Sequence, residues 1–429
     1  MRPSLPAERR ETVKRGVALR TVEMPFARAL HLALIFRDGA QGDPEGRAGI
    51  TNLAARMLLE GTRGRDALAL ATALEGLGAH YSAEVRHEVS ILRFSLPREL
   101  FVRALPLIGE LVFEAGFRAV DFERLRDQTA AFLEKELKDP RETAAKHLNA
   151  LLLRGTPQAR PTKGTPESVR SAELGEVKSR GNALLRAGVE AVVCGRLGRS
   201  EKEALGVLMG RFPAARSPRS PLAAVTPAEP GLYFHPWPGA VQSELRLGTP
   251  GPAPGGAEWF PFLLLNTILG GKFTSRLNLN LRETHGYTYA ARSFLQERRA
   301  ISCFCVSAAV ATGVTVPALR EMFGELDGMT AAAFDPKEVT DAAGYLSGSF
   351  HYALDSPSLY LHRVVEREAL WLGPDYFRRY LDFLDRAPGF DFRRVPRTPF
   401  DRSRAVLVVV GAPAVRGRLK ALGMPLREI

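Results

Sequence analysis

The stretch GITNLAARMLLEGT, residues 49–62, predicts a helix that packs on a protein core. Its apolar residues recur at i, i+3, i+4, i+7 and i+8, which forms one stripe along a helix. They are Ile50, Leu53, Ala54, Met57 and Leu58. Asn52, Ala55 and Arg56 keep the i, i+3, i+4 spacing and therefore share a second face of the same helix. An ordinary amphipathic helix without any further role would show the same stripe.

The length and composition of the chain are typical of a globular protein with two domains. The chain has 429 residues, of which 45% are hydrophobic and 25% charged. A single core stops growing at about 250–300 residues, so two domains of about 200 residues each are expected. No run of about 18 apolar residues is present, so we expect no membrane span and no membrane partner.

The start of the chain and its cysteines bear on the cellular compartment. The opening sequence MRPSLPAERRETVKRG has no apolar segment behind its charges, so a secretory signal is not expected. Three cysteines are too few, and odd in number, for a disulfide framework, and this favours a reducing compartment. We therefore expect a cytoplasmic location.

The formal net charge of +12 raises the question of a nucleic-acid partner. The basic residues are scattered and never form a run of five or six like charges. No zinc-finger or RNA-recognition signature accompanies them, so no nucleic acid is expected. A positive surface that attracts an acidic partner or substrate, or an arginine bias without function, explains the charge better. A nucleic-acid-binding module stays open as an alternative, which the lack of a steeply salt-dependent complex would exclude.

The expected elements follow the same order in both halves of the chain. Each half offers two strands, a helix, a shorter helix, two more strands, several helices, an apolar strand and a closing helix. The closing units GVEAVVCGRLGRSEKEALGVLMG and AVLVVVGAPAVRGRLKALG correspond segment for segment. In the second half, a short helix is expected around Ser275 to Arg282, followed by a strand near YTYAARSFLQ.

This repeat predicts an α+β fold of two homologous domains, each a mostly antiparallel sheet covered by helices. The expected domains are residues 1–212 and 231–429. Between them, residues 213–230 read PAARSPRSPLAAVTPAEP, a proline-rich sequence that suits an extended and semi-rigid linker.

Several stretches of the sequence carry a resemblance that covers nearly the whole chain. In the first half they are GITNLAARMLLEGT, LEGLGAHYSAEV and DFERLRDQTAAFLEKELKDP. In the second half they are VQSELRLGTPGP, LLLNTILGGKFTSRLNLNLRETHGYTYAARSF and the terminal AVLVVVG. The chain resembles the pitrilysin/insulinase family of zinc metallopeptidases, and within it the two-subunit branch related to mitochondrial processing peptidase.

The resemblance aligns the first helix with the zinc motif H-x-x-E-H, in which two histidines bind the metal and the glutamate polarises a water molecule. Asn52, Ala55 and Arg56 stand at these three positions. Aligning the closing Asp-Pro of DFERLRDQTAAFLEKELKDP places the family's third ligand at Phe132 and a further functional glutamate at Leu125. A guanidinium repels a divalent cation and offers no lone pair. We therefore expect no catalytic residue, no metal and no other cofactor in this chain.

One pair of residues keeps the family pattern. The resemblance implies that one subunit carries the zinc helix, while the other supplies an arginine and a tyrosine from the motif LRETHGYTY. The matching positions are Arg282 and Tyr289, with Gly286 expected to form the turn between them. An arginine can hold a substrate carbonyl or carboxylate, and a tyrosine hydroxyl can stabilise an oxyanion. The alternatives are a solvated arginine at a helix end and a core tyrosine in a strand.

The resemblance implies a non-zinc subunit that pairs with a homologous H-x-x-E-H subunit to cleave peptides or unfolded proteins. The zinc is then expected in the partner, and a homodimer is possible when the chain is alone. Peptide substrate is expected to add as a strand beside HYSAEVR, around Ala83. Two alternatives remain open: a purely structural core-type scaffold subunit, and a peptidase that is active through another site.

Overall fold

The computed structural model describes residues 4–215, 226–330 and 334–429. Contacts divide the chain into two compact units. Unit 1 comprises Met1–Glu134, Arg160–Pro221 and His351–Ala369, and unit 2 comprises Lys135–Ala159, Leu222–Phe350 and Leu370–Ile429. Most of the predicted linker, residues 216–225, lies outside the described residues. The predicted ranges 1–212 and 231–429 follow the sequence repeat, whereas the compact units each draw a segment from the other half.

Unit 1 is built on a six-stranded sheet, called sheet 1, whose order is β1-β2-β6-β3-β5-β4. Its strands are β1 (Glu8–Lys14), β2 (Val17–Glu23), β3 (Ala29–Phe36), β4 (His80–Val85), β5 (Ser90–Pro97) and β6 (Val189–Gly195). Only the pair β2 and β6 is parallel. The helices are α1 (Ile50–Met57), α2 (Ala67–Glu75), α3 (Arg98–Phe113), most of α4 (Ala119–Leu137), α6 (Pro166–Arg170), α7 (Leu174–Arg186), α8 (Arg199–Arg211) and α13 (Pro357–Ala369).

Unit 2 is built on a second six-stranded sheet, called sheet 2, whose order is β12-β7-β11-β8-β10-β9. Its strands are β7 (Gly231–Pro236), β8 (Gln242–Gly251), β9 (Ala291–Glu297), β10 (Ser302–Ala311), β11 (Val406–Gly411) and β12 (Leu426–Glu428). The helices are α5 (Pro140–Leu152), α9 (Trp259–Asn266), α10 (Arg276–Asn278), α11 (Thr315–Met329), most of α12 (Pro336–Leu354), α14 (Tyr376–Arg386) and α15 (Val415–Leu419). Thr267–Gly271 and Leu279–Thr284 are π-helical.

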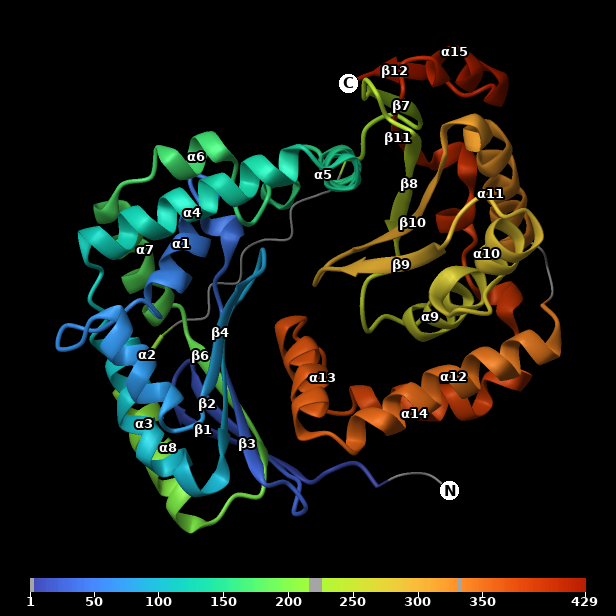
Figure 1. The fold of residues 1–429 in the computed structure, drawn as a ribbon. Coiled ribbons are helices and arrows are strands. Elements are labelled where there is room, and N and C mark those ends of the chain that lie inside the picture. The colour runs from blue at the N-terminus through green and yellow to red at the C-terminus, as the bar shows by residue number, and fades with distance from the viewer. Residues whose placement is uncertain (1–3, 216–225, 331–333) are drawn as a thin grey trace. The chain divides into compact units, whose positions relative to one another are not determined.

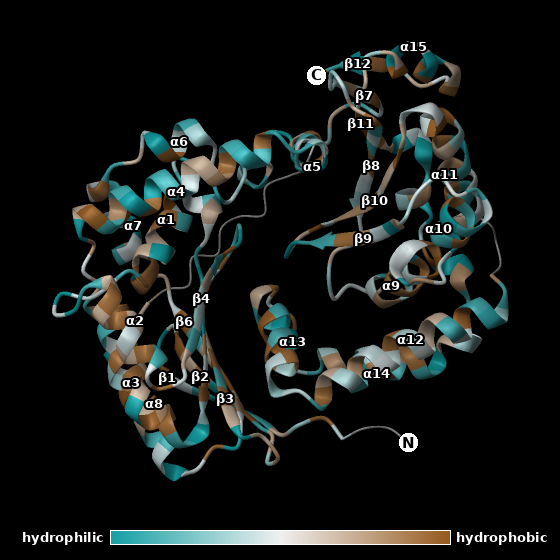
Figure 2. Cartoon of the chain, viewed as in Figure 1, coloured by the Kyte–Doolittle hydropathy of each residue, from teal (hydrophilic) through white to brown (hydrophobic). Residues whose placement is uncertain are grey.

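The two sheets confirm the predicted α+β fold and its internal repeat. Five strands are repeated, β2 to β6 in sheet 1 and β7 to β11 in sheet 2. Numbered along the chain, they lie in the order first, fifth, second, fourth and third in both sheets, and the first and fifth are parallel. The remaining strand of each sheet lies at the same edge but differs in direction, since β1 pairs antiparallel with β2 and β12 pairs parallel with β7. Each sheet is therefore mixed, and each carries an apolar core; Figure 2 shows hydrophobic residues concentrated along the sheet 1 strands and on α3.

Helix α13 packs on the face of sheet 1 opposite the one covered by α3 and α8 (Figure 1). Charged side chains form part of this contact, beside buried apolar residues of α13 such as Leu361, Val364 and Val365. Three arginines and three glutamates meet there: Arg20, Arg37 and Arg367, with Glu8, Glu190 and Glu368. All except Glu8 are at most 8% exposed. We call these six residues the buried ion-pair network.

The geometry of the network joins strands that are far apart in the sequence. The guanidinium of Arg20 lies 3.1 Å from the carboxylates of both Glu190 and Glu368. Arg367 of α13 reaches 2.6 Å from Glu8 on the edge strand β1. Burial acts to raise the pKa of Glu190, but the surrounding guanidinium groups outweigh it and lower that pKa. The carboxylate of Glu190 is therefore held ionised by its arginine partners.

Helix α5 plays the corresponding part on sheet 2, but through apolar contacts. It packs on β8 and β11, with Leu148 and Leu152 among the buried residues of this cluster. Gly248 makes the close approach possible, because a Cβ there would lie 2.5 Å from Leu152 Cδ1. Unit 2 thus takes a helix from the first half of the sequence, as unit 1 takes α13 from the second.

We expect Glu190→Gln to destabilise unit 1. The substitution leaves Arg20 and Arg37 buried without their shared carboxylate, which costs about 3–5 kcal/mol in comparable buried pairs. Urea denaturation followed by far-UV circular dichroism should show a lower midpoint. Tryptophan fluorescence reports on unit 2 alone, because Trp237, Trp259 and Trp371 all belong to it.

The matched control is Glu203→Gln on α8. Glu203 lies 2.6 Å from Arg199, but both side chains are largely exposed, so the pair contributes little to stability. Equal urea midpoints for the two variants would contradict a stabilising role of the buried network.

Candidate functional site

Helix α1, which lies in GITNLAARMLLEGT, is held at its N-terminal end by a buried carboxylate. Asp43 accepts hydrogen bonds from the backbone N–H groups of Gly49, at 2.8 Å, and Thr51, at 3.1 Å. Gly49 has φ +98°, and a Cβ there would lie 2.6 Å from the carbonyl oxygen of Lys163. The first turn of α1 is therefore fixed in place, and the predicted amphipathic helix is confirmed.

The three residues at the H-x-x-E-H positions have different environments on α1. Ala55 is buried in a small cluster with Val85 and packs near Ala83 of β4. Asn52 is half-buried and makes no side-chain hydrogen bond within the described residues. Arg56 extends towards α4, where its Nη1 donates a hydrogen bond of 2.8 Å to Thr129 Oγ1.

Helix α4 carries Leu125 and Phe132, the two positions that the resemblance assigns to glutamates, and it is joined to α1 through Thr129. Leu125, Thr129 and Phe132 have the i, i+4, i+7 spacing and share one face of α4. Thr129 accepts the Arg56 hydrogen bond and donates its own hydroxyl to the carbonyl of Leu125, at 2.7 Å. Phe132 is 47% exposed, and Lys163 Nζ lies 4.5 Å from the centre of its ring. The hydrogen bond from Arg56 to α4 thus spans the place where the family's ligands would meet.

The chemistry of these side chains does not fit a zinc ion. A zinc site needs imidazole nitrogens and carboxylate oxygens as ligands. At the five family positions this chain instead has an amide, a methyl group, a guanidinium, an isobutyl group and a phenyl ring. Burial lowers the pKa of Arg56, the charge of Glu60 acts against this, and Arg124 lowers it further. The guanidinium nevertheless stays protonated at neutral pH. Throughout the described ranges, no group of three or more His, Cys, Asp or Glu side chains could hold a metal ion.

Strand β4 is the edge strand of sheet 1 beside α1. Among the described residues it pairs with β5 alone, and one of its faces contacts α1. Because Tyr81, Ala83 and Val85 alternate with residues of the opposite face, they are the ones that lie towards α1. An edge strand presents unpaired N–H and C=O groups to which an extended peptide can add. The structure thus leaves the predicted peptide edge open next to the changed zinc positions.

Arg282 and Tyr289 lie at one corner of unit 2. Arg282 is in the π-helical segment Leu279–Thr284, where its Cζ lies 4.4 Å from the centre of the Phe273 ring and its Nε 3.3 Å from Glu283. Tyr289 is 91% exposed, which excludes the alternative of a core tyrosine. The strand expected near YTYAARSFLQ forms as β9, which begins at Ala291, so Tyr289 lies just before it.

The turn between the two residues follows the prediction. Gly286 has φ +63°, in the region that favours glycine, and its N–H donates a hydrogen bond of 3.1 Å to the Arg282 carbonyl. The expected short helix forms as α10 and its π-helical continuation, and a π turn at this place could not be read from the apolar spacing. No hydrogen bond or cation–π interaction joins the side chains of Arg282 and Tyr289 in the described part of unit 2.

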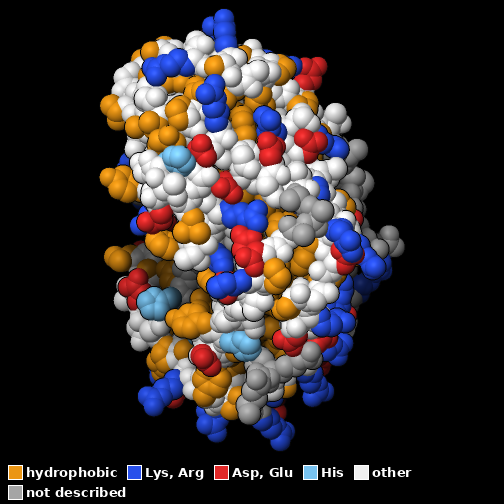
Figure 3. Space-filling view, turned by 90° about the vertical axis from the view of Figure 1, so that its right-hand side faces the viewer, with side chains coloured by type: hydrophobic (Ala, Val, Ile, Leu, Met, Phe, Trp, Pro, Cys, Tyr) orange, Lys and Arg blue, Asp and Glu red, His pale blue; other side chains and the backbone are white. Residues whose placement is uncertain are grey.

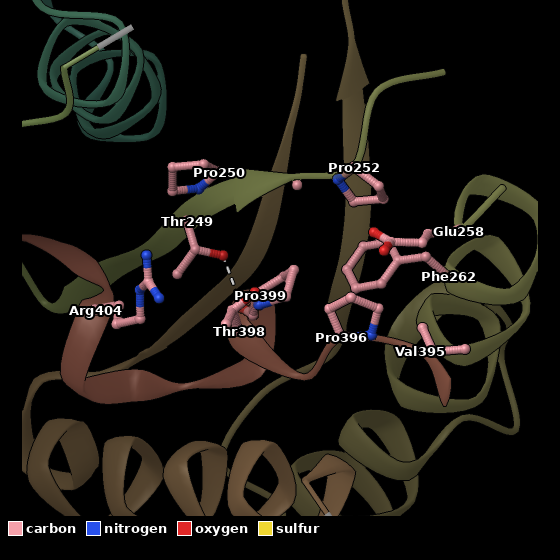
Figure 4. A pocket seen from close by; sticks show the side chains of 11 residues that line it. Thr249, Pro250, Pro252, Glu258, Phe262, Val395, Pro396, Thr398, Pro399 and Arg404 are labelled. Carbon is pink, nitrogen blue, oxygen red and sulfur yellow. Dashed lines mark hydrogen bonds between the residues drawn. The ribbon is translucent and has the colours of Figure 1, made fainter. Parts of the chain in front are cut away.

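Two cavities of unit 2 lie away from this pair. One, of about 240 Å³, is lined mainly by prolines and threonines, with Arg404 at one end and Glu258 at the other (Figure 4). Thr249 Oγ1 donates a hydrogen bond of 2.7 Å to the Pro399 carbonyl at its side. The other, of about 380 Å³, borders the segment of Arg282 through Leu279. Neither cavity is lined by Arg282 or Tyr289.

Sequence reasoning missed the residues that support these positions. Thr129 was not singled out, because a threonine inside a helix carries no chemical signature of its own. Asp43 lies outside α1 and caps it from six residues away, so the usual capping position, Gly49, gave no signal. Both roles depend on contacts between segments rather than on local spacing.

The comparisons with known proteins agree with this geometry. The sequence model described as insulinase, peptidase family M16, matches residues 20–166, and the peptidase M16 inactive domain matches residues 187–345. An uncharacterised zinc protease of Streptomyces coelicolor is 24% identical over 379 residues, which cover 85% of this chain and 81% of that protein. Subunit 1 of the mitochondrial cytochrome b-c1 complex of Bos taurus is 27% identical over 146 residues, covering 33% of this chain and 30% of that one.

A solved structure shows the same fold over nearly the whole chain. The peptidase M16 inactive domain of Pseudomonas fluorescens superposes with a TM-score of 0.84 at 23% identity, and the match covers 95% of this chain and 98% of that one. The two family models together span both halves of the sequence, including the zinc-motif region and the motif of Arg282. This chain is a member of the insulinase family of M16 peptidases.

Proposed function

We propose that this chain is the non-zinc subunit of a heterodimeric zinc metalloendopeptidase, which lends Arg282 and Tyr289 to a homologous H-x-x-E-H partner. The observation that carries the proposal is the hydrogen bond between Arg56 and Thr129. It places a permanent cation among the positions that hold zinc in an active member, so hydrolysis needs a metal supplied by another chain.

The surface of unit 2 supports the second part of the proposal. Tyr289 offers a phenol hydroxyl with no partner of its own among the described residues, which suits a hydrogen bond to a substrate carbonyl as its oxygen becomes negative. Arg282 is held against Phe273, which limits the conformations of a long side chain before substrate arrives. Both features favour a role of Arg282 and Tyr289 in substrate cleavage over an unused remnant of the family motif.

A structural scaffold subunit is the second candidate function. It is favoured by the 27% identity with subunit 1 of the cytochrome b-c1 complex over 146 residues. In that case Arg282 and Tyr289 would serve no catalysis, and the fold alone would have been kept. The described residues contain no helix that is both long and apolar enough to cross a bilayer.

The partner, the peptide substrate and a cytoplasmic location are parts of the same proposal. A nucleic-acid partner is not favoured, because Lys and Arg side chains are spread among acidic ones over the face of the molecule in Figure 3. Co-purification from the source cell tests the partner directly: a chain of similar length with an H-x-x-E-H motif should accompany this one.

In a reconstituted pair, we expect Tyr289→Phe and Arg282→Ala each to lower peptide cleavage. Loss of one donor to a developing oxyanion typically costs a factor on the order of 10² in kcat, so this is the expected effect of Tyr289→Phe. Arg282→Ala should mainly raise KM, since an arginine that holds the substrate acts before the chemical step. Steady-state kinetics with an unfolded protein or a quenched peptide measures both.

Two control variants match the local environments of these residues. Tyr352→Phe changes a tyrosine that is 71% exposed in unit 1, and Arg211→Ala changes an arginine whose Cζ lies 4.4 Å from a phenylalanine ring centre. Neither should alter cleavage. Unchanged kinetics of Arg282→Ala and Tyr289→Phe would favour the scaffold.

We expect the purified chain to hold far less than one equivalent of zinc by elemental analysis. The triple variant Asn52→His, Arg56→His, Phe132→Glu supplies three ligands and should bind about one zinc per chain, because structural and catalytic zinc sites need three or four such ligands. The control Asn52→His, Arg56→Ala, Phe132→Glu supplies only two and should bind weakly. Stoichiometric zinc in the unaltered chain, together with casein cleavage, would instead reveal an active peptidase with another site.

A further inference from the structure

The face of sheet 2 beneath α5 changes from apolar to basic along its strands. Around Gly248 it is apolar and packs against Leu148 and Leu152. Two residues earlier on the same face of β8 stands Arg246, which is 6% exposed. The strand thus carries a buried guanidinium just beyond the end of the apolar contact.

The strand register places a second arginine in the same row. Ser307 of β10 is directly opposite Arg246 of β8 on one side and Arg292 of β9 on the other. Residues directly opposite one another on neighbouring strands point to the same face. Arg292 is exposed, and its Nε lies 3.4 Å from Ser307 Oγ. Two arginines therefore flank one hydroxyl across three adjacent strands.

A third arginine, Arg141 at the start of α5, joins this row. Burial lowers the pKa of Arg246, the charge of Glu244 opposes that change, and the charges of Arg141 and Arg292 lower it further. The guanidinium of Arg246 is thus repelled by those of both Arg141 and Arg292. The side chain of Arg141 makes no hydrogen bond or ion pair within the part of the chain that the structure describes.

The basic groups are not balanced by the acidic ones. Glu244 lies 3.1 Å from Arg246, and burial raises its pKa although Arg246 and Arg141 act against this. Asp139 caps α5 by accepting a hydrogen bond of 2.8 Å from the Arg141 N–H. The buried ion-pair network of unit 1 pairs three arginines with three glutamates, whereas this row has an excess of guanidinium donors.

The row also lies beside the loop of Tyr289. Thr288 Oγ1 donates a hydrogen bond of 2.7 Å to the carbonyl of Ala309, and Ala309 is opposite Glu244 in the sheet. The loop is therefore fastened to the strand that carries Ser307, next to the arginines. A peptide that contacts Tyr289 would pass within reach of Arg292.

We propose that Arg141, Arg246 and Arg292, with Ser307, form a binding site for a peptide carboxylate, either an acidic side chain or a C-terminus. The anion site follows from the geometry of unit 2, and the choice of a peptide as its carrier rests on the proposed function. Planar guanidinium groups bind a carboxylate through paired N–H donors, and a hydroxyl adds a further donor. The site selects acidic substrates, in keeping with the net charge of +12.

The test measures binding of labelled peptides to the full chain by fluorescence anisotropy. Three extended peptides are compared: one has a central Glu and an amidated C-terminus, one has Gln in its place and is amidated, and one has Gln and a free C-terminus. Each carboxylate peptide thus differs from the amidated Gln peptide at one point. The two carboxylate peptides distinguish a side chain from a C-terminus as the group bound. We expect at least one of them to bind about 10-fold more tightly than the amidated Gln peptide at moderate salt.

Variants of the two exposed arginines assign this preference to the site. Arg292→Gln and Arg141→Gln should each abolish the discrimination, and Arg292→Lys should keep part of it. Arg199→Gln is the control, because it removes the same charge from an exposed ion pair in unit 1. Circular dichroism verifies that each variant is folded.

Several results would overturn the proposal: equal affinity for all three peptides, no binding up to about 1 mM, a range typical of non-specific contacts, or an equal loss in Arg199→Gln. The outcome is separate from that of the cleavage test. If Arg282→Ala leaves cleavage unchanged while the carboxylate preference persists, the proposed subunit role fails and the site stands. If cleavage depends on Arg282 but no carboxylate preference exists, only the site fails.

Discussion

The buried ion-pair network is the constraint on which unit 1 depends. A sheet face that carries Arg20, Arg37 and Glu190 cannot be covered by an ordinary apolar helix, because the charges would lose water without gaining partners. Helix α13 supplies Arg367 and Glu368, and β1 supplies Glu8, so that each buried charge has an opposite one within about 3 Å. Such a network stabilises less than its Coulomb energy suggests, but removing one partner leaves an uncompensated buried charge, which is strongly destabilising. It specifies which helix covers the sheet, and it fixes the edge strand β1 in the same step.

Local patterns in the sequence predicted most strands and helices, and the repeat predicted that both sheets have the same strand order. The sequence did not reveal β1, because ERRETVK is polar and largely exposed and joins sheet 1 through backbone pairing and Glu8. It also gave no sign that α13 belongs to unit 1 and α5 to unit 2. Those assignments depend on contacts between residues far apart in the sequence, such as Arg367 with Glu8 and Gly248 with Leu152. Periodicity describes which face of a helix is buried, but not which sheet covers it.

The sequence indicated which segments form the candidate site, but not how their side chains are arranged. Alignment of DFERLRDQTAAFLEKELKDP placed Phe132 and Leu125 near Arg56, and the hydrogen bond from Arg56 to Thr129 confirms that α1 and α4 meet there. The sequence could not show that a threonine holds the guanidinium, or that Tyr289 is exposed on a loop instead of lying in β9. The arginine row of sheet 2 was equally hidden, because Arg141, Arg246 and Arg292 come together only through strand register and helix docking. What the sequence did carry was the excess of positive charge that this row helps to explain.

The exchange of α13 and α5 has a consequence for how the chain could have arisen. Two copies of an ancestral half would each have needed their own covering helix, either on their own sheet or on that of a second copy. In the present chain, the first half alone would leave Arg20, Arg37 and Glu190 without α13, and the second half alone would leave the apolar face around Gly248 without α5. Each half of the present sequence therefore supplies a helix that packs on the sheet of the other half, so a change in either helix acts on a sheet encoded far away in the chain.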